Sequence, residues 1–482
     1  MARLVEHNYA NLDKLISHSP TEPAMSFIPA VSTKPSLRDL NGYQWFVFAM
    51  ASLAWLFDCL DQQLFILARN DALKSLLPGA DPTTVKLYGG YATSIFLAGW
   101  ATGGLFFGSI GDRVGRAKTL TITVLIYSLC TGLSAFSTGW LDFAAYRFLT
   151  GLGVGGVFGL AVALIADSLP PANRPGALGL LQALSAVGNV TAGLISMLMA
   201  SLTASGTIAP GTSWKYMFLI GAVPAFLCVF IQMRLKEPAN WIAAKAAAKE
   251  TGVRFGSYLE LFGDSRWRTN ALLGMLLCIT GVVGLWGIGF FSPELVGDVI
   301  TKSLREKGIP EDQIASQKGY WIGINSIIQN LGAFFGMIGF SWVAQKIGRK
   351  GAFTIGFIAA FFVTFGYFRM FQTMNDLWMS ALMGFFQLGL FAGFAIYLPE
   401  LFPLRLRSTG TSFCYNLGRF IAASGPFTLG MLQQYLAQGA RERGASELDA
   451  FRDACCAMST VFLLGLVAVF FLPETKGKPL PE

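Results

Sequence analysis

The stretch Gly108–Lys118 reads GSIGDRVGRAK and joins two apolar runs, at residues 89–111 and 119–139. A shift of 233 residues places GDRVGR at 111–116 on AQKIGR at 344–349. The same shift aligns five further pairs: Gly99 with Gly332, Gly103 with Gly336, Asp167 with Glu400, Pro170 with Pro403 and Arg174 with Arg407. Because one offset matches so many unlike residue types, the sequence predicts two related halves.

The composition excludes a set of soluble domains. Of 482 residues, 53% are hydrophobic and 13% charged, whereas soluble proteins carry about 25% charged residues. Membrane-spanning helices need about twenty apolar residues each. Runs of that kind lie at 43–67, 89–111, 119–139, 142–167, 176–201, 214–234, 269–294, 319–344, 351–372, 376–400, 408–433 and 454–472. The sequence therefore predicts an all-α polytopic membrane protein with twelve transmembrane helices.

The longest polar connection, 235–268, divides these runs into two sets of six. Together with the repeat, this predicts two six-helix bundles, 43–234 and 269–472, related by a pseudo-two-fold axis along the membrane normal. Residues 1–42 and 473–482 are then terminal tails.

Lysine and arginine set the predicted orientation. With the N-terminus inside, 22 of the 36 basic residues lie in cytoplasmic segments, 12 in outer segments and 2 within helices. Basic residues favour the cytoplasmic side, so both termini are predicted to be cytoplasmic in a multi-pass protein of the cell membrane. The net charge is +8. The basic residues lie in loops beside the membrane, so anionic lipid is the expected partner of these residues and nucleic acid is not.

Several segments together resemble the major facilitator superfamily. They are the Gly108–Lys118 loop with its degenerate copy QKIGRK at 345–350, RFLTGLGVGG at 147–156, LPELFPLRLR at 398–407, KEPANW at 236–241 and PETKG at 473–477. The resemblance covers residues 43–478. It implies a transporter whose two bundles rock about a central cavity.

The resemblance also implies that charges at the helix ends latch the two bundles in the outward-facing state. The candidate latch residues are Gly111, Asp112, Arg113, Gly115, Arg116, Asp167, Arg174, Arg349, Glu400 and Arg407. The plainer alternative is a basic loop that only orients the protein. Gln345 stands where the first copy has Asp112, so we expect a weaker second latch.

Asp58 and Asp61 fall inside the predicted helix 43–67, where a charge costs roughly 2.5–3.5 kcal/mol on insertion. A spacing of three places both carboxyls on one helical face, about 4.5 Å apart along its axis. Arg147, near the outer start of predicted helix 142–167, is expected at their depth and matches Asp61 slightly better. The group is either a proton-coupling site or a static ion pair that fixes helix packing.

An Asp-x-x-Asp pattern in the first helix with an arginine in the fourth resembles the proton symporters of aromatic acids and sialic acid. The resemblance implies the proton as coupling ion and no other cofactor. Arg147 and Arg419 could bind an anionic substrate, and Gln387, Asn325, Gln329 and Trp286 add candidate contacts at mid-depth. Arg419 could equally pair with a neighbouring helix, and Trp286 could face lipid.

Other chemistries find little support. His7 and His18, the two histidines, precede the first apolar run, which excludes a histidine-based metal site or triad in the body. Residues 151–156 match GxGxxG, but they lie within an apolar run without a preceding strand, so close helix packing is the better interpretation. No enzyme is expected.

We therefore predict a monomeric, proton-coupled symporter that imports a small organic anion or acidic sugar. Three alternatives stay open: a neutral-sugar symporter, a metabolite or drug exporter, and a membrane sensor that does not transport. Drug antiporters of this superfamily carry Gly-Pro in their fifth helix, whereas the predicted helix 176–201 has no proline. Small-molecule substrate, protons and lipid are the expected partners.

Overall fold

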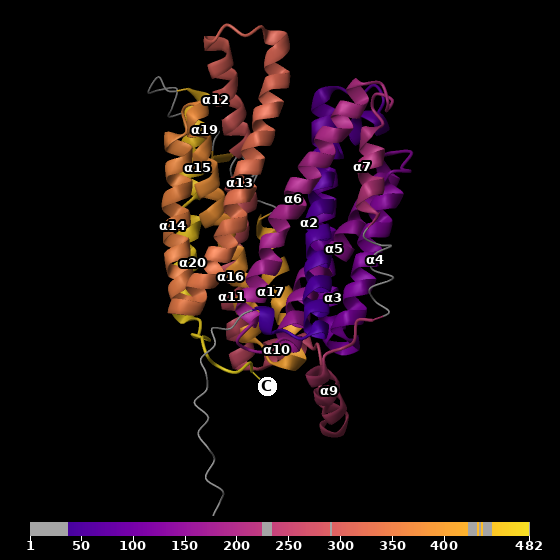
Figure 1. The fold of residues 1–482 in the computed structure, drawn as a ribbon, viewed down its shortest axis with the longest axis vertical. Helices are drawn as coiled ribbons and strands as arrows, with labels where there is room; N and C mark the ends of the chain where they lie inside the picture. The colour runs from indigo at the N-terminus through magenta and orange to yellow at the C-terminus, as the bar shows by residue number, and fades with distance from the viewer. Residues whose placement is uncertain are drawn as a thin grey trace, which may run out of the picture. The chain divides into compact units, whose positions relative to one another are not determined.

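The structure is a computed structural model that describes residues 37–223, 234–289, 292–422, 431–432, 435–436 and 446–481. The predicted tail 1–42 lies mostly outside this part of the chain. Every regular element in the described ranges is a helix, as the sequence predicted (Figure 1).

The first half begins with a short 3-10 turn, η1 (Leu37–Asp39), and six helices follow. They are α2 (Gly42–Leu76), α3 (Pro82–Val114), α4 (Arg116–Ser134), α5 (Trp140–Ser168), α6 (Arg174–Ala204) and α7 (Ser213–Gly221). Two short helices, α9 (Ala239–Thr251) and α10 (Tyr258–Gly263), form the connection to the second half. The predicted central connection 235–268 is therefore largely helical.

The helices of the second half are more often interrupted. They are α11 (Ser265–Val283) with the π-helix η2 (Gly284–Ile288), α12 (Ser292–Glu306), α13 (Glu311–Ile347), α14 (Arg349–Met370), η4 (Met374–Leu377), α15 (Trp378–Met383), η5 (Gly384–Leu388), α16 (Gly389–Tyr397), η6 (Leu398–Leu401), η7 (Leu404–Leu406), α17 (Arg407–Ala422), α19 (Glu447–Met458) and α20 (Val461–Phe471).

Nine helical segments of the described part are long and apolar enough to cross a membrane. The other three predicted spans correspond to α7, to α11 with η2, and to α17, each of which ends at or near residues that the structure does not describe. The polytopic all-helical fold is confirmed, and the count of twelve stays a prediction.

The two halves repeat the same helix start. Gly115 precedes α4 with φ 137°, and Gly348 precedes α14 with φ 94°. Glu237 accepts hydrogen bonds from two backbone N–H groups in the first turn of α4 (3.0 and 3.2 Å). Glu474 does the same for α14 (both 3.0 Å). A side chain at either glycine would meet that carboxylate, so glycine is required by both conformation and space.

Small residues let the helices approach closely. A Cβ at Gly99 or Gly103 of α3 would overlap the backbone of α5, and a Cβ at Gly155 would overlap α3. In the second half, Gly332 and Gly336 lie equally close to the backbone of α15 and η5. These contacts confirm that residues 151–156 serve helix packing, as small-xxx-small patterns do in membranes.

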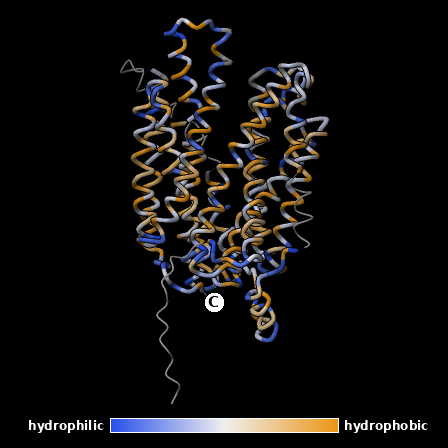
Figure 2. The backbone as a smooth tube through the Cα atoms, viewed as in Figure 1, coloured by the Kyte–Doolittle hydropathy of each residue, from blue (hydrophilic) through white to orange (hydrophobic). Residues whose placement is uncertain are grey.

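The long helices of the described unit have hydrophilic ends. Helices α9 and α10 lie at one end, called here the α10 end, and the α12–α13 connection lies at the other, called the α12 end (Figure 1). Hydrophilic residues gather at the α10 end and at the tips of α12 and α13, while the long helices between are mainly hydrophobic (Figure 2). This distribution fits helices that cross a bilayer.

Candidate functional site

A cavity of about 590 Å³ lies between the two halves of the described chain. The first half contributes walls from α2, α3 and α6, and the second from η2, α12, α13, α16 and α17. Arg419 is the only charged residue among the described residues that line it. Six amide side chains also line it: Gln62, Gln63, Gln182, Asn189, Gln329 and Asn330. Trp55, Trp100, Phe391 and Tyr415 add aromatic walls.

The Arg419 side chain is held in place by neighbours that do not neutralise it. Its guanidinium carbon lies 3.8 Å from the ring centroid of Trp100 and 4.3 Å from that of Tyr415. Nη1 donates to Asn416 Oδ1 (3.0 Å), and Nε has no hydrogen-bond partner among the described residues. No described carboxylate lies within 4.0 Å. Arg419 is thus a fixed positive charge at the cavity wall.

The positive charge that acts on Asp58 is that of Arg419, not that of Arg147. Its buried carboxylate interacts with the charges of Asp61 and Arg419. The Gln62 amide donates to Asp58 Oδ2 (3.4 Å) and also lines the cavity. Gln62 therefore connects Asp58, which does not line the cavity itself, to the space a substrate would occupy.

Asp61 is the acid that faces Arg147, as the predicted depths indicated. Their charges interact, but no ion pair forms within 4.0 Å in the described part of the chain. The Thr131 hydroxyl accepts from Arg147 Nη2 (3.3 Å) and interacts with the Asp61 carboxyl. Neither Asp61 oxygen has a hydrogen bond of normal geometry to a described residue. A hydroxyl thus separates the two charges.

Arg147 is fully buried in a pocket of hydroxyls and rings. It donates to Ser134 Oγ (2.7 Å) and Thr150 Oγ1 (3.0 Å), and its guanidinium lies 4.8 Å from the ring centroid of Phe218. It does not line the cavity. In this conformation its position suits coupling through Asp61 more than contact with a substrate.

The other predicted substrate contacts divide in two. Gln329 lines the cavity and accepts from the Ser292 hydroxyl (3.4 Å). Asn325 and Gln387 are buried outside it, where Asn325 accepts from Ser380 and Gln387 donates to the carbonyl of Gly284 (2.8 Å). The side chain of Trp286, on η2, lies outside the described residues.

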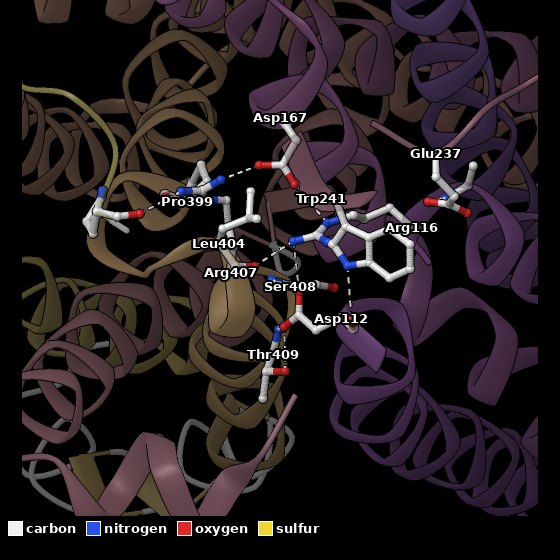
Figure 3. Close-up of polar contacts among 12 residues, drawn as sticks. Asp112, Arg116, Asp167, Glu237, Trp241, Pro399, Leu404, Arg407, Ser408 and Thr409 are labelled. Atoms are coloured by element: carbon white, nitrogen blue, oxygen red, sulfur yellow. Dashed lines mark hydrogen bonds and ion pairs between the residues drawn. The ribbon is translucent and has the colours of Figure 1, made fainter. Parts of the chain in front are cut away.

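At the α10 end, Asp112 joins the two halves. Its carboxylate accepts from the backbone N–H groups of Ser408 (3.2 Å) and Thr409 (2.8 Å) and from the Thr409 hydroxyl (2.7 Å), at the first turn of α17 (Figure 3). An acid there satisfies unpaired N–H groups and complements the helix dipole. Arg116 lies 3.1 Å from the same carboxylate.

Arg116 extends this junction into a fully buried network. It contacts Asp167 Oδ2 (2.8 Å) and donates to the carbonyl of Leu404 (2.6 Å) in the other half. Asp167 also pairs with Arg407 of α17 (Figure 3). The sequence had grouped these charges, and the structure brings them together across the two halves.

The second copy of the loop does not cross between the halves. Arg349 pairs with Glu400 (2.7 Å), which lies in the same half. Gln345 donates to the Ser341 carbonyl (3.2 Å) of its own helix, unlike Asp112. Arg174 donates to the Leu169 carbonyl (2.8 Å), and Arg113 to that of Gly256 (3.0 Å). Neither of these arginines makes an ion pair within the described residues.

Helices α6 and α13 show which end is closed. Towards the α10 end, Ser341 Oγ donates to the Pro175 carbonyl (2.8 Å), and at mid-depth Asn189 Nδ2 donates to Asn330 Oδ1 (3.1 Å). Further towards the α12 end, a Cβ at Gly193 or at Gly323 would meet nothing within 4 Å, and both glycines line the cavity. The cavity therefore faces the α12 end while the α10 end is closed.

Sequence reasoning missed several members of the site. Trp241 Nε1 donates to the Asp112 carbonyl (3.0 Å), and Thr409 binds its carboxylate. Trp100 was also not predicted as functional, and the hydrogen bond that joins Asn189 to Asn330 was not predicted. Trp241 and Glu237 lie in the KEPANW segment, so the motif was visible, but the contact of its indole with the end of α3 was not.

Two helical halves enclose a central cavity, and ion pairs and hydrogen bonds between the halves close one end of it. This arrangement defines an integral multi-pass membrane transporter. A family model described as Major Facilitator Superfamily matches residues 40–426, and the chain belongs to this superfamily. The resemblance predicted from the loop motifs is confirmed.

Relatives and solved structures agree with this assignment. The chain is 27% identical to a cis,cis-muconate transport protein of Acinetobacter baylyi, covering 82% of this chain and 89% of that one. It is 28% identical to the sialic acid transporter NanX of Escherichia coli, covering 69% and 74%. The structure of the proton:xylose symporter XylE matches with a TM-score of 0.69 at 19% identity, covering 91% and 98%. That last match shows the fold alone.

Proposed function

We propose that this protein is a proton-coupled symporter that imports a small organic carboxylate. One observation carries the proposal: Arg419 is the single charged residue among the described residues that line the cavity, and no described acid pairs with it. A substrate carboxylate would supply the missing negative charge through charge-assisted hydrogen bonds. The relatives named for muconate and sialic acid both carry carboxylate compounds, which supports the same substrate class.

The aromatic and amide side chains that line the cavity favour a substrate whose carboxylate is attached to a flat or polar group. Trp55, Trp100 and Phe391 offer surfaces for an unsaturated ring or chain. The six amide side chains can donate to and accept from hydroxyl or carbonyl groups. The amides also favour the second candidate, a neutral-sugar symporter, in which Arg419 would have no role in binding.

Proton coupling is assigned to Asp61 and Asp58 together. Both carboxyls are buried, and neither forms a close ion pair in the described part of the chain. A buried carboxylate without a close counter-charge is costly, so each acid gains from a proton. When a substrate carboxylate reaches Arg419, it competes with Asp58 for that positive charge, and protonation of Asp58 removes the competition. Substrate and proton then favour each other's binding.

We place the α10 end and the C-terminus in the cytoplasm, which makes the described conformation outward-facing. The charge imbalance of 22 to 12 between the predicted sides supports this orientation. A reporter fused after residue 482 should report a cytoplasmic location. A periplasmic reading would reverse the direction of every step proposed here.

The substrate class is tested by uptake into proteoliposomes of a labelled panel: aromatic acids, muconate, sialic acid, uronic acids and neutral sugars, each with and without an inward proton gradient. We expect carboxylates alone to accumulate, and to do so only with the gradient. Arg419→Gln should reduce uptake by roughly 10- to 100-fold, the value of one charge-assisted hydrogen bond. Arg419→Lys should retain part of it.

The matched control is Arg369→Gln. Arg369 lies at the end of α14, pairs with Asp453 (2.8 Å) and does not line the cavity, so uptake should stay near that of the wild type. Accumulation of a neutral sugar that is unchanged by Arg419→Gln would replace this proposal with the neutral-sugar symporter.

A further inference from the structure

A second pocket, of about 580 Å³, lies at the α10 end and shares no lining residue with the central cavity. Its walls come from both halves of the protein. Asp167 and Arg174 belong to the first half, and Leu404, Arg405 and Arg407 belong to the second. One face of α9 and residues 479–481 complete it.

The pocket is basic because Arg174 lacks, among the described residues, the ion pair that its counterpart in the second half makes. Its counterpart in the second half, Arg407, pairs with Asp167. The carboxylate equivalent to Asp167 is Glu400, but Glu400 binds Arg349 (2.7 Å) and the Thr475 hydroxyl (2.6 Å). Within the described residues, no carboxylate lies within 4.0 Å of Arg174.

The other charged residues of the lining also leave the pocket with more positive than negative charge. The lining holds three arginines and one aspartate, and that aspartate is already paired with Arg407. Arg405 pairs with Glu260 (2.5 Å). The charge of Arg174 is repelled by that of Arg407 and attracted, at longer range than an ion pair, by those of Asp167 and Glu400. An anion placed between these two guanidinium groups would be attracted by both.

The remaining walls are apolar and small. Ala244, Ala247 and Ala248 lie on one face of α9 and line the pocket, with Leu404 and Leu480 on other walls. A volume of this size is typical of sites for small organic molecules. The chemistry therefore fits an organic anion with a compact apolar body better than an inorganic ion.

We propose that this pocket binds such a carboxylate from the α10 side, and that the bound carboxylate holds the α10 end closed. The contacts come from both halves, so the complete site exists only while Asp167 and Arg407 remain together. A ligand that binds one of two states shifts the equilibrium towards that state. An organic anion that accumulates on the α10 side would thereby inhibit further transport.

The test uses full-length protein in lipid nanodiscs with Arg419→Gln present throughout, which removes the positive charge of the central cavity. Ser341→Cys reports opening, because Ser341 is buried between α6 and α13 at the α10 end. The probes are naphthalene-2-carboxylate and its neutral amide, naphthalene-2-carboxamide. Protein without Ser341→Cys gives the background labelling by maleimide.

We expect the carboxylate to slow maleimide labelling about tenfold at a concentration of about ten times its Kd, as linkage requires, and the carboxamide to have no effect. Arg174→Gln should abolish the protection, and Arg174→Lys should keep part of it. Equal protection by the amide, or protection that survives Arg174→Gln, would overturn the proposal. Because transport is not measured, failure here is distinct from failure of the carboxylate symporter.

Discussion

Four buried charges occupy the middle of the protein, and none is closely paired with another in the described chain. Asp61 faces Arg147, and Asp58 faces Arg419. Aromatic rings and hydroxyls hold the two arginines instead. A tight ion pair would keep each acid ionised. The proposed proton exchange therefore requires the looser arrangement that is found here.

The two acids should differ in what they control. Asp61→Asn should abolish accumulation driven by a proton gradient and spare exchange of substrate across the membrane, because the charge of Asp61 acts on Arg147 outside the cavity. Asp58→Asn should weaken substrate affinity as well, because Asp58 acts on Arg419 and Gln62. Uptake and counterflow are measured for each variant, corrected for protein amount. Wild-type accumulation in both variants would leave the carboxyls with a structural role only.

Arg147→Ala should be tolerated worse than either asparagine variant. It leaves Asp61 buried without a compensating charge, which costs about 3–5 kcal/mol, and also leaves the hydroxyls of Ser134 and Thr150 without their donor. We expect lower yield and a lower Tm in detergent. Adding Asp61→Asn to Arg147→Ala should recover part of the Tm, since the stranded charge is then gone. If the double variant is no more stable than Arg147→Ala, the two charges are not coupled.

The N-terminal ends of α4 and α14 each require a glycine. Gly115→Ala and Gly348→Ala should each cost about 1–3 kcal/mol, because both residues have positive φ and their new methyl groups would meet Glu237 and Glu474. Gly176→Ala, in the first turn of α6, is the matched control, since a Cβ there meets nothing within 4 Å. Thermal unfolding in detergent should show a lower Tm for the first two only. Equal shifts in all three would contradict the requirement for glycine.

Asp112 connects the end of α3 to the start of α17 and should control the equilibrium between states. Asp112→Asn keeps one acceptor oxygen but loses the charge that binds Arg116 and the α17 dipole. We expect the α10 end to open more often, so that maleimide labels the Ser341→Cys variant faster. Gln345→Asn is the control, because Gln345 bonds only within α13. A loss of expression with unchanged labelling would point to orientation in the membrane as the role of the loop.

Local patterns predicted helices, repeats and charge groupings, and Gln345 in place of Asp112 indicated that the second copy would be the weaker latch. The apolar runs led to the all-helical fold, and the depth of Asp61 and Arg147 followed from their places in two helices. The electrostatic interaction of Asp58 with Arg419 could not be predicted, because it depends on how α17 packs against α3 and α5. The Asp112 contact with Thr409 joins residues 297 positions apart, and no local pattern encodes such a contact.

In the described conformation of the whole molecule, the α10 end is closed. The Asp112 contacts, the Asp167–Arg407 pair and the α6–α13 contact all join the halves there. Within the described residues, the second copy of the loop, with Gln345, adds no such contact. Transport requires these contacts to break and the α12 end to close, so the two states must differ by only a few kcal/mol. We expect that a latch formed by one copy of the loop keeps that difference small.

A disulfide across α6 and α13 should arrest this motion. A Cβ at Gly179 would lie 2.5 Å from the Cβ of Ser341, and a disulfide needs about 3.5–4.5 Å, so a small separation of the helices suffices. In Gly179→Cys/Ser341→Cys, oxidation should abolish uptake while substrate still binds from the α12 end, and reduction should restore uptake. Each single cysteine under the same oxidant is the control. Native cysteines in the described part are buried, which limits background reaction.

The converse pair tests the other half of the cycle. Gly193→Cys/Gly323→Cys lies where α6 and α13 are open, so oxidation should cross-link it only when the α12 end closes. Added substrate and a proton gradient should therefore raise its cross-linking rate, whereas the Gly179/Ser341 disulfide, formed first, should suppress it. If both pairs can be cross-linked at once in one molecule, or if the fully cross-linked α10 end still supports uptake, the two halves do not alternate.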